Sequence, residues 1–185
     1  MTFKHLGIGS GPRILVPLEI QVQTIAHLRD RGSNHEEGFL AWSGIHRDSR
    51  IIVKSAFIPA GEVLRHHLGI GFSDDAIEVI ANKILAKGEK LIAQVHSHPF
   101  EAFHSETDNR FPLIHRKGFL SIVVPFFGKY GFDRFDYFRI YEYLQDNQWD
   151  WIGPETARKR FMLEGRGRGT KWKSLKNSSL ARKGS

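Results

Sequence analysis

The chain has 185 residues, the size of one domain with room for a short extension. Hydrophobic residues make up 41% and charged residues 25% of the chain, so the composition excludes a wholly disordered protein. There is no cysteine, which excludes disulfides, thiolate metal ligands and cysteine nucleophiles.

The net charge of +7 is unevenly distributed along the chain. Residues 153–185 hold ten of the 27 Lys and Arg residues and two of the 20 acidic residues, whereas residues 1–152 have a net charge of −1. We therefore predict a near-neutral domain over residues 1–153. Residues 154–185 are predicted to form a basic, flexible tail, because they contain few apolar side chains. Nucleic acid is expected as a partner only through this tail.

The longest apolar run covers residues 119–127 and contains Pro125. A membrane-spanning helix needs about 20 apolar residues, so this run is too short. The first residues lack the apolar core of a signal peptide. We expect a cytoplasmic protein with no membrane partner.

In chain order, the first half of the sequence alternates between strand-like apolar runs and helical periodicity. The predicted elements are a strand at 13–17, a helix at 19–32 ending on Gly32, a hairpin from 38–44 and 49–59, a loop at 59–71, and a helix at 73–89. The last helix is the clearest, because Ser73 can cap it. Its expected apolar stripe consists of Ile77, Ile80, Ile84 and Leu85.

The second half is richer in strand patterns. We predict a buried strand at 90–99, a short helix at 104–111, a buried strand at 118–125, an aromatic loop at 126–136, and a final hairpin from 137–144 and 148–153. Together these elements predict a mixed α/β fold with a central sheet of about six strands flanked by helices.

The segment that carries chemistry is His96-Ser97-His98-Pro99, followed by Ser105 and Asp108. On an extended strand, residues i and i+2 point to the same side, so His96 and His98 can present two imidazoles on one face. A carboxylate returned by Asp108 would complete a set that suits one Zn²⁺ ion, with the fourth position open to water. Three protein ligands and an open position are typical of a catalytic zinc site.

Each part of this pattern also has an ordinary structural interpretation. A His-x-His pair is common on exposed strands, and Ser105 with Asp108 fits a helix N-terminus. The pair Glu36 and Glu37 could be solvated before a strand. The combination is much rarer by chance than its parts, because it supplies metal ligands, a base and a polar group together.

The pattern resembles the JAB/MPN (JAMM) zinc metallopeptidases, which have an upstream Glu, then His-Ser/Thr-His-Pro, then Ser-x-x-Asp. The resemblance covers roughly residues 12–145 and implies a mixed JAB/MPN-like, cytidine-deaminase-like fold. By position, it implies His96, His98 and Asp108 as metal ligands and Ser105 as the serine that stabilises the oxyanion.

The family glutamate has a glycine seven residues later, and Glu37 with Gly44 matches that spacing. Glu37 is therefore taken as the catalytic base, with Glu36 as the fallback. Six residues separate His98 from Ser105, where the familiar eukaryotic members have seven. His104, His66, His67 and His115 are further candidates by residue type, each with a surface role as the simpler interpretation.

The mechanism implied by the resemblance is hydrolysis of an amide bond by zinc-activated water. Zinc would make hydroxide available near neutral pH. Glu37 would accept the proton and deliver it to the leaving amine, and Ser105 would help to stabilise the oxyanion. The implied substrate is a ubiquitin-like protein or its conjugate, cleaved after the C-terminal glycine.

The compact size and short loop resemble bacterial JAB-domain proteins, several of which accompany E1-like and E2-like conjugation enzymes in systems implicated in phage defence. A set of aromatic side chains could form an apolar docking surface, although core packing is the simpler interpretation for most of them. These side chains are Phe100, Phe103, Phe126, Phe127 and Tyr130.

Two alternatives remain open from the sequence. The first is a JAMM peptidase that acts on a sulfur-carrier protein or a small peptide. The second is a zinc-stabilised binding module whose basic tail binds nucleic acid, which would give salt-sensitive affinity.

Overall fold

The computed structural model describes residues 11–59, 63–66, 69–103 and 113–165. The strands in the described ranges are β1 (Arg13–Val16), β2 (Phe39–Arg47), β3 (Arg50–Phe57), β4 (Val63–His66), β5 (Gly69–Phe72), β6 (Lys90–Ser97), β7 (Leu120–Val124), β8 (Arg139–Tyr143), β9 (Trp149–Ile152) and β10 (Phe161–Leu163). The helices are α1 (Leu18–Ser33), α2 (Asp74–Ala86) and α4 (Pro154–Arg160), with 3₁₀ turns η1 (Phe126–Gly128) and η2 (Gly131–Tyr137).

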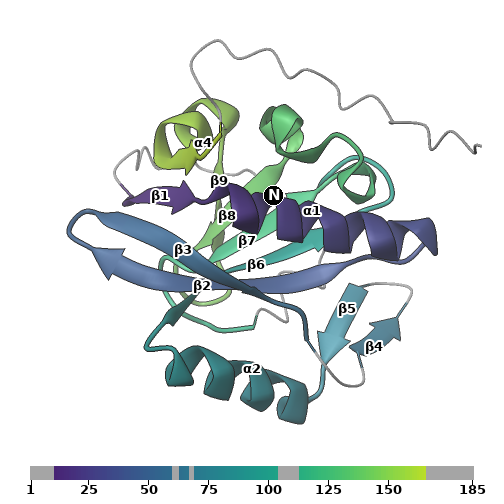
Figure 1. Ribbon diagram of the computed structural model, residues 1–185, viewed down its shortest axis with the longest axis horizontal. Helices are drawn as coiled ribbons and strands as arrows, with labels where there is room; N and C mark the ends of the chain where they lie inside the picture. The colour runs from purple at the N-terminus through teal and green to yellow at the C-terminus, as the bar shows by residue number, and fades with distance from the viewer. Residues whose placement is uncertain (1–10, 60–62, 67–68, 104–112, 166–185) are drawn as a thin grey trace, which may run out of the picture.

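The centre of the fold is a curled eight-stranded mixed sheet with the strand order β10-β1-β3-β2-β6-β7-β8-β9 (Figure 1). Strands β2 and β3 form an antiparallel hairpin, β2 also pairs antiparallel with β6, and β6 pairs parallel with β7. Strands β4 and β5 form a separate two-stranded sheet. The predicted mixed α/β fold is confirmed.

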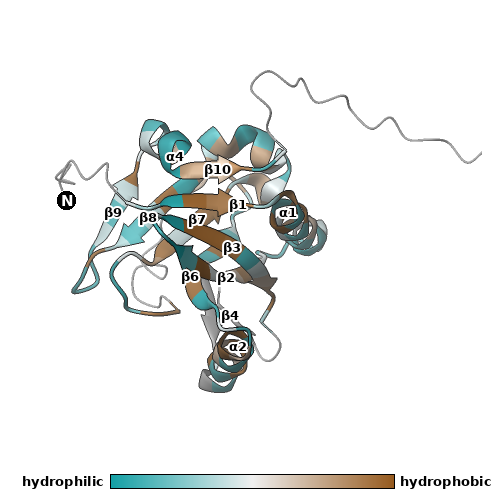
Figure 2. Cartoon of the chain, turned by 60° about the vertical axis from the view of Figure 1, so that its left-hand side comes forward, coloured by the Kyte–Doolittle hydropathy of each residue, from teal (hydrophilic) through white to brown (hydrophobic). Residues whose placement is uncertain are grey.

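The two long helices pack on opposite faces of the sheet (Figure 2). On one face, Leu28 of α1 shares a core with Trp42 of β2, whose indole N–H donates to Thr24 Oγ1 over 3.0 Å. On the other face, Ile80 and Ile84 of α2 share a core with the neighbouring β2 residue, Ala41. Alternation along β2 therefore assigns successive side chains to different helices.

Helix α2 begins as the sequence predicts. The Ser73 hydroxyl accepts a hydrogen bond from the backbone N–H of Ala76, and Ile80 and Ile84 are buried. Leu85, predicted to belong to the apolar stripe, is instead exposed, because the sheet covers only the face that carries Ile80 and Ile84. Within the described ranges, no helix combines the length and apolar character needed to cross a membrane.

Three sequence predictions about the fold are wrong. The predicted loop at 59–71 contains the β4–β5 hairpin, and the main sheet has eight strands instead of about six. The domain also extends past residue 153, because residues 154–160 form α4 and β10 pairs parallel with β1. Part of the predicted tail is thus an edge strand, and the buried Arg160 ties this segment to Glu142 of β8 through an ion pair.

Candidate metal centre

His96 lies near the end of β6 and His98 directly follows the strand, and the fold brings their two rings together. His96 and His98 are 3% and 5% exposed, and their ring centroids lie 5.1 Å apart at an interplanar angle of 50°. The i, i+2 spacing places both rings on one side of the strand, as predicted. That side is the α2 side, because Val95, which directly precedes His96 and points to the other face, belongs to the core beneath α1.

Aromatic rings hold both imidazoles in place. Phe39 is the register partner of His96 on β2, and the two rings stack with centroids 6.5 Å apart and only 12° between their planes. Phe103 meets His98 edge-on, with centroids 4.6 Å apart. Each imidazole therefore has a packed neighbour that restricts its rotation, which favours a fixed orientation of the ring nitrogens.

Glu37 is carried to this place by the pairing of β2 with β6. The backbone N–H of Ser97 donates to Gly38 O over 3.0 Å, and the backbone N–H of Gly38 donates to Ser97 Oγ over 3.0 Å. Glu37 directly precedes Gly38, so this junction brings the backbone of Glu37 to the end of β6.

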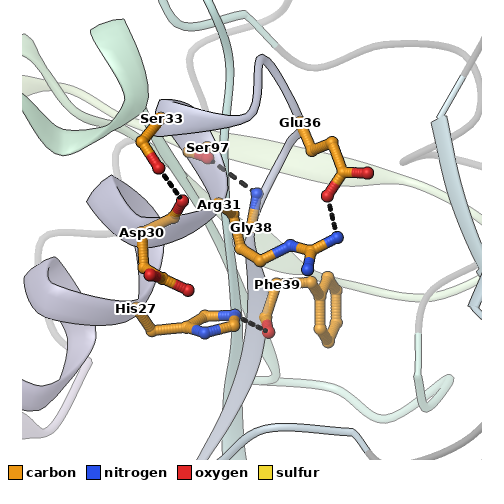
Figure 3. Close-up of polar contacts among 8 residues, drawn as sticks. All are labelled: His27, Asp30, Arg31, Ser33, Glu36, Gly38, Phe39 and Ser97. Carbon is orange, nitrogen blue, oxygen red and sulfur yellow. Dashed lines mark hydrogen bonds and ion pairs between the residues drawn. The ribbon is translucent and has the colours of Figure 1, made fainter.

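Glu36, the fallback base, contacts the helix that precedes β2. Its carboxylate forms an ion pair with the guanidinium of Arg31, near the C-terminal end of α1 (Figure 3). This contact secures the short connection between α1 and β2.

His27 supports the same strand from the α1 side. Its Nε2–H donates to the carbonyl of Phe39 over 3.0 Å (Figure 3). Burial lowers the pKa of His27, against the opposing effect of the hydrogen bond to Phe39; nearby Arg31 lowers the pKa further. A neutral ring at pH 7 suits this donor role.

The backbone of His98 is bound from both sides by the end of β7. Its N–H donates to Val124 O over 3.0 Å, and its carbonyl accepts from Phe127 N–H over 2.9 Å. Phe126 and Phe127 have φ angles of 54° and 50°, a left-handed conformation that is costly for aromatic residues. The backbone is therefore strained at Phe126 and Phe127, next to the hydrogen bond that holds His98.

The remaining predicted site residues lie outside the described ranges. Ser105, Asp108 and the candidate His104 belong to residues 104–112, and His67 is likewise not described. The side chain of the candidate His66 in β4 also lies outside the described part of the structure. His115 is exposed and packs edge-on against Tyr143, with centroids 5.6 Å apart. Within the described ranges, no group of three or more His, Asp or Glu side chains gathers closely enough to hold a metal.

The donor set on β6 fits a zinc ion. Zinc ligates imidazole nitrogens at about 2.0–2.1 Å, and two buried rings with neighbouring centroids can face one ion. His96 and His98 would supply two nitrogen ligands, and a carboxylate such as Asp108 would supply the third. The stacking and backbone contacts described above would orient the ligands, as the surroundings of metal sites usually do.

No family model matches the chain. It is 31% identical over 140 residues to a curated protein of Sinorhizobium fredii (strain NBRC 101917 / NGR234) named probable metalloprotease y4jG, and the match covers 75% of this chain and 85% of that protein. The chain belongs to the metalloprotease family of y4jG. A metal site at His96 and His98 agrees with this family of metal-dependent peptidases.

Among solved structures, the solution structure of protein DSY2949 from Desulfitobacterium hafniense is similar to this metalloprotease-family chain. The TM-score is 0.55 with 15% sequence identity, and the similarity covers 82% of this chain and 92% of the other. At this identity the similarity shows a shared fold.

Sequence reasoning missed two residues that shape the site. The sequence analysis gave Ser97 no role of its own, but its hydroxyl links β6 to Gly38. Phe127 was considered as a surface or core residue, yet its backbone holds His98. A small hydroxyl residue between two histidines was a usable signal for Ser97, whereas no local pattern reveals the conformation of Phe127.

Proposed function

We propose that this chain is a zinc-dependent peptidase of the JAMM type that cleaves the bond after the C-terminal glycine of a ubiquitin-like protein. The observation that carries the proposal is the buried pair His96 and His98, with the Glu37 segment bonded alongside at Gly38 and Ser97. The spacing of Ser105 and Asp108 in the sequence and the metalloprotease family of y4jG support it.

In this proposal, His96, His98 and Asp108 hold the metal. A zinc ion bound there supplies Lewis acidity, which lowers the pKa of water to about 7 and polarises the peptide carbonyl. Glu37 accepts the proton of the attacking water and passes it to the leaving amine, which completes the hydrolysis. The Ser105 hydroxyl donates a hydrogen bond to the developing oxyanion, an interaction of about 3 kcal/mol in related chemistry.

The proposed substrate is a ubiquitin-like protein, either as a precursor or as a conjugate made by E1-like and E2-like enzymes. An extended C-terminus ending in small residues can enter a narrow site and pair through its backbone. Cleavage after Gly-Gly distinguishes this substrate from an unrelated peptide.

The test uses the full chain loaded with one equivalent of zinc and a ubiquitin fusion whose Gly-Gly is followed by a short peptide. We expect cleavage after the second glycine, loss of cleavage with a chelator, and recovery on adding zinc. His98→Ala serves as the control for the ligand set. Cleavage by His98→Ala at the rate of the unaltered chain, or cleavage elsewhere in the fusion, would contradict the proposal.

A further inference from the structure

The C-terminal half of α1 lies against the strained turn η1, which follows β7. Arg29 of α1 binds this turn at two successive carbonyls: its Nε–H donates to Gly128 O over 3.1 Å, and its Nη2–H donates to Lys129 O over 2.8 Å. A planar guanidinium that binds two neighbouring carbonyls restrains both the position and the direction of the backbone that carries them. Helix α1 therefore holds the C-terminal end of η1.

Gly32, three residues further along the same helix, allows the two segments to touch. A Cβ atom on Gly32 would lie 2.6 Å from Cγ of Phe127 and still closer to its Cβ, so any side chain here would push Phe127 away from α1. The backbone of Gly32 is helical, with no positive φ angle that would itself require glycine. The absence of a side chain at position 32 therefore serves the contact with Phe127.

The same turn holds the chain that carries the second histidine. Phe127 N–H donates to His98 O over 2.9 Å, and Phe126 N–H donates to Phe100 O over 2.9 Å. Phe126 and Phe127 have left-handed φ angles of 54° and 50°, a conformation that persists only where the surrounding contacts impose it. These contacts come from the chain after β6 on one side and from α1 on the other.

The two histidines differ in how their backbone is held. His96 lies within β6, which pairs with β2 on one side and with β7 on the other. His98 directly follows the last residue of the strand. Its N–H donates to Val124 O over 3.0 Å, and its carbonyl accepts from Phe127 N–H. The placement of His98 therefore depends on η1, whereas His96 is held by the sheet.

We propose that Arg29 and Gly32 are positioning residues for the metal ligand His98, because together they hold η1 in the strained conformation from which Phe127 binds the His98 backbone. The inference rests on the proposed function, which assigns His98 as a ligand, and it adds two residues of α1 to the support of that site. Both residues act through the turn. Because an imidazole nitrogen ligates zinc at about 2.0–2.1 Å, a small displacement of the His98 backbone weakens the site.

The first test replaces Gly32 by alanine in the full chain. Helix propensity alone predicts a more stable α1, because alanine is the better helix former. The contact with Phe127 predicts instead that zinc affinity, measured by competition with a chromophoric chelator, falls about tenfold or more. The matched control is Gly153→Ala, whose Cβ would meet nothing within 4 Å, and its zinc affinity should be unchanged.

The second test replaces Arg29 by alanine and is independent of the first. Removal of a positive charge would by itself favour binding of a cation, so weaker zinc binding identifies a positional effect. We expect a loss of about fivefold, smaller than for Gly32→Ala, because the bonds of Arg29 lie at or near the surface. Arg29→Lys should recover part of the affinity, because a lysine can still bind one carbonyl. Arg158→Ala on α4 is the control, because it removes another exposed arginine, and it should leave zinc affinity unchanged.

Two further readouts separate positioning of the ligand from a general loss of folding. The d–d absorption spectrum of the Co²⁺-loaded protein reports the geometry of the metal ligands, and urea titration of the metal-free chain reports its stability. We expect a changed cobalt spectrum in Gly32→Ala and Arg29→Ala, and the spectrum of the unaltered chain in both controls.

Unchanged zinc affinity and cobalt spectrum in either α1 variant would remove that residue from the inference, and the same result in both would overturn it. Weaker affinity that follows the loss of stability, with an unchanged cobalt spectrum, would mean only a loss of folded protein and would also contradict it. If the unaltered chain binds no zinc, the proposed function and this inference fail together. If the variants weaken zinc binding as expected but the unaltered chain does not cleave the ubiquitin fusion, the proposed function fails and this inference stands.

Discussion

Gly38 and Ser97 are joined by two hydrogen bonds where β2 begins and β6 ends, one between backbone groups and one from Gly38 N–H to Ser97 Oγ. This pair holds the chain of Glu37 beside the two histidines. Both residues are buried, so the hydrogen bond from Gly38 N–H to the Ser97 hydroxyl is shielded from water. The relative position of the proposed base and the proposed metal ligands depends on this junction.

Replacing Ser97 by alanine should lower both stability and activity. The Gly38 N–H would lose its acceptor in a buried position, which costs about 1–3 kcal/mol. Displacement of Glu37 should lower kcat about tenfold or more, because small misplacements of a catalytic group are costly. Chemical denaturation and steady-state kinetics measure the two effects.

The matched control is Ser121→Ala on the neighbouring strand. Ser121 is fully buried, and its Oγ accepts from Gln94 over 3.2 Å. This variant should lose similar stability but keep its kcat. Equal loss of kcat in both variants would show that the Ser97 effect is general to buried serines.

The two neighbouring glutamates should respond differently to the same substitution. Glu37→Gln should keep the fold and the bound metal but lose at least about 100-fold in kcat, because an amide cannot take up the proton. Glu36→Gln should keep kcat and lose about 0–1 kcal/mol of stability, since its partly exposed ion pair with Arg31 is weak. Metal analysis and kinetics on the two proteins decide the assignment, and the opposite pattern would make Glu36 the base.

Gly44 should not tolerate a side chain. It lies where β2 changes register with β3, and a Cβ atom there would sit 2.0 Å from the carbonyl oxygen of Ile52. Gly44→Ala should therefore destabilise the chain by about 2–3 kcal/mol. Gly153→Ala, whose Cβ would meet nothing within 4 Å, should cost less than about 1 kcal/mol. Thermal unfolding measures the stability of both variants. If the two variants are equally stable, a steric clash at Gly44 is not the cause of destabilisation.

His27 should contribute a pH-dependent part of the stability. Burial lowers the pKa of the folded-state ring below its ordinary value of 6.5, so the unfolded chain takes up a proton at a higher pH than the folded chain. The contribution is therefore intact above about pH 6.5 and is lost as the pH falls from there through the lower folded value. His27→Gln keeps a donor for Phe39 O but cannot titrate. Urea titrations of both proteins from pH 8 to pH 5 should show a smaller loss of stability in the variant, and parallel curves would argue against this origin.

Local patterns predicted the parts of the fold that depend on neighbouring residues. The Ser73 cap and the buried strand predicted at 90–99 follow from a few adjacent side chains, and both are confirmed. Strand β10 could not be predicted in this way, because three residues gain strand structure only by pairing with β1, almost 150 positions away. For the same reason, the charged residues of α4 were predicted to be the start of a flexible tail.

The site divides along similar lines. The shared face of His96 and His98 follows from strand geometry and was predicted, whereas the two bonds between Gly38 and Ser97 require the register of β2 on β6. The exposure of Phe100 and Phe103 could not be predicted, because apolar residues near a buried strand are usually part of a core.

The most direct test of the account is X-ray absorption spectroscopy of the full chain loaded with one equivalent of zinc. We predict a site with two imidazole ligands and oxygen donors in the remaining positions, and loss of one imidazole in His98→Ala. A spectrum without imidazole scattering, or one that His98→Ala leaves unchanged, would show that the two histidines at the end of β6 are not a metal centre.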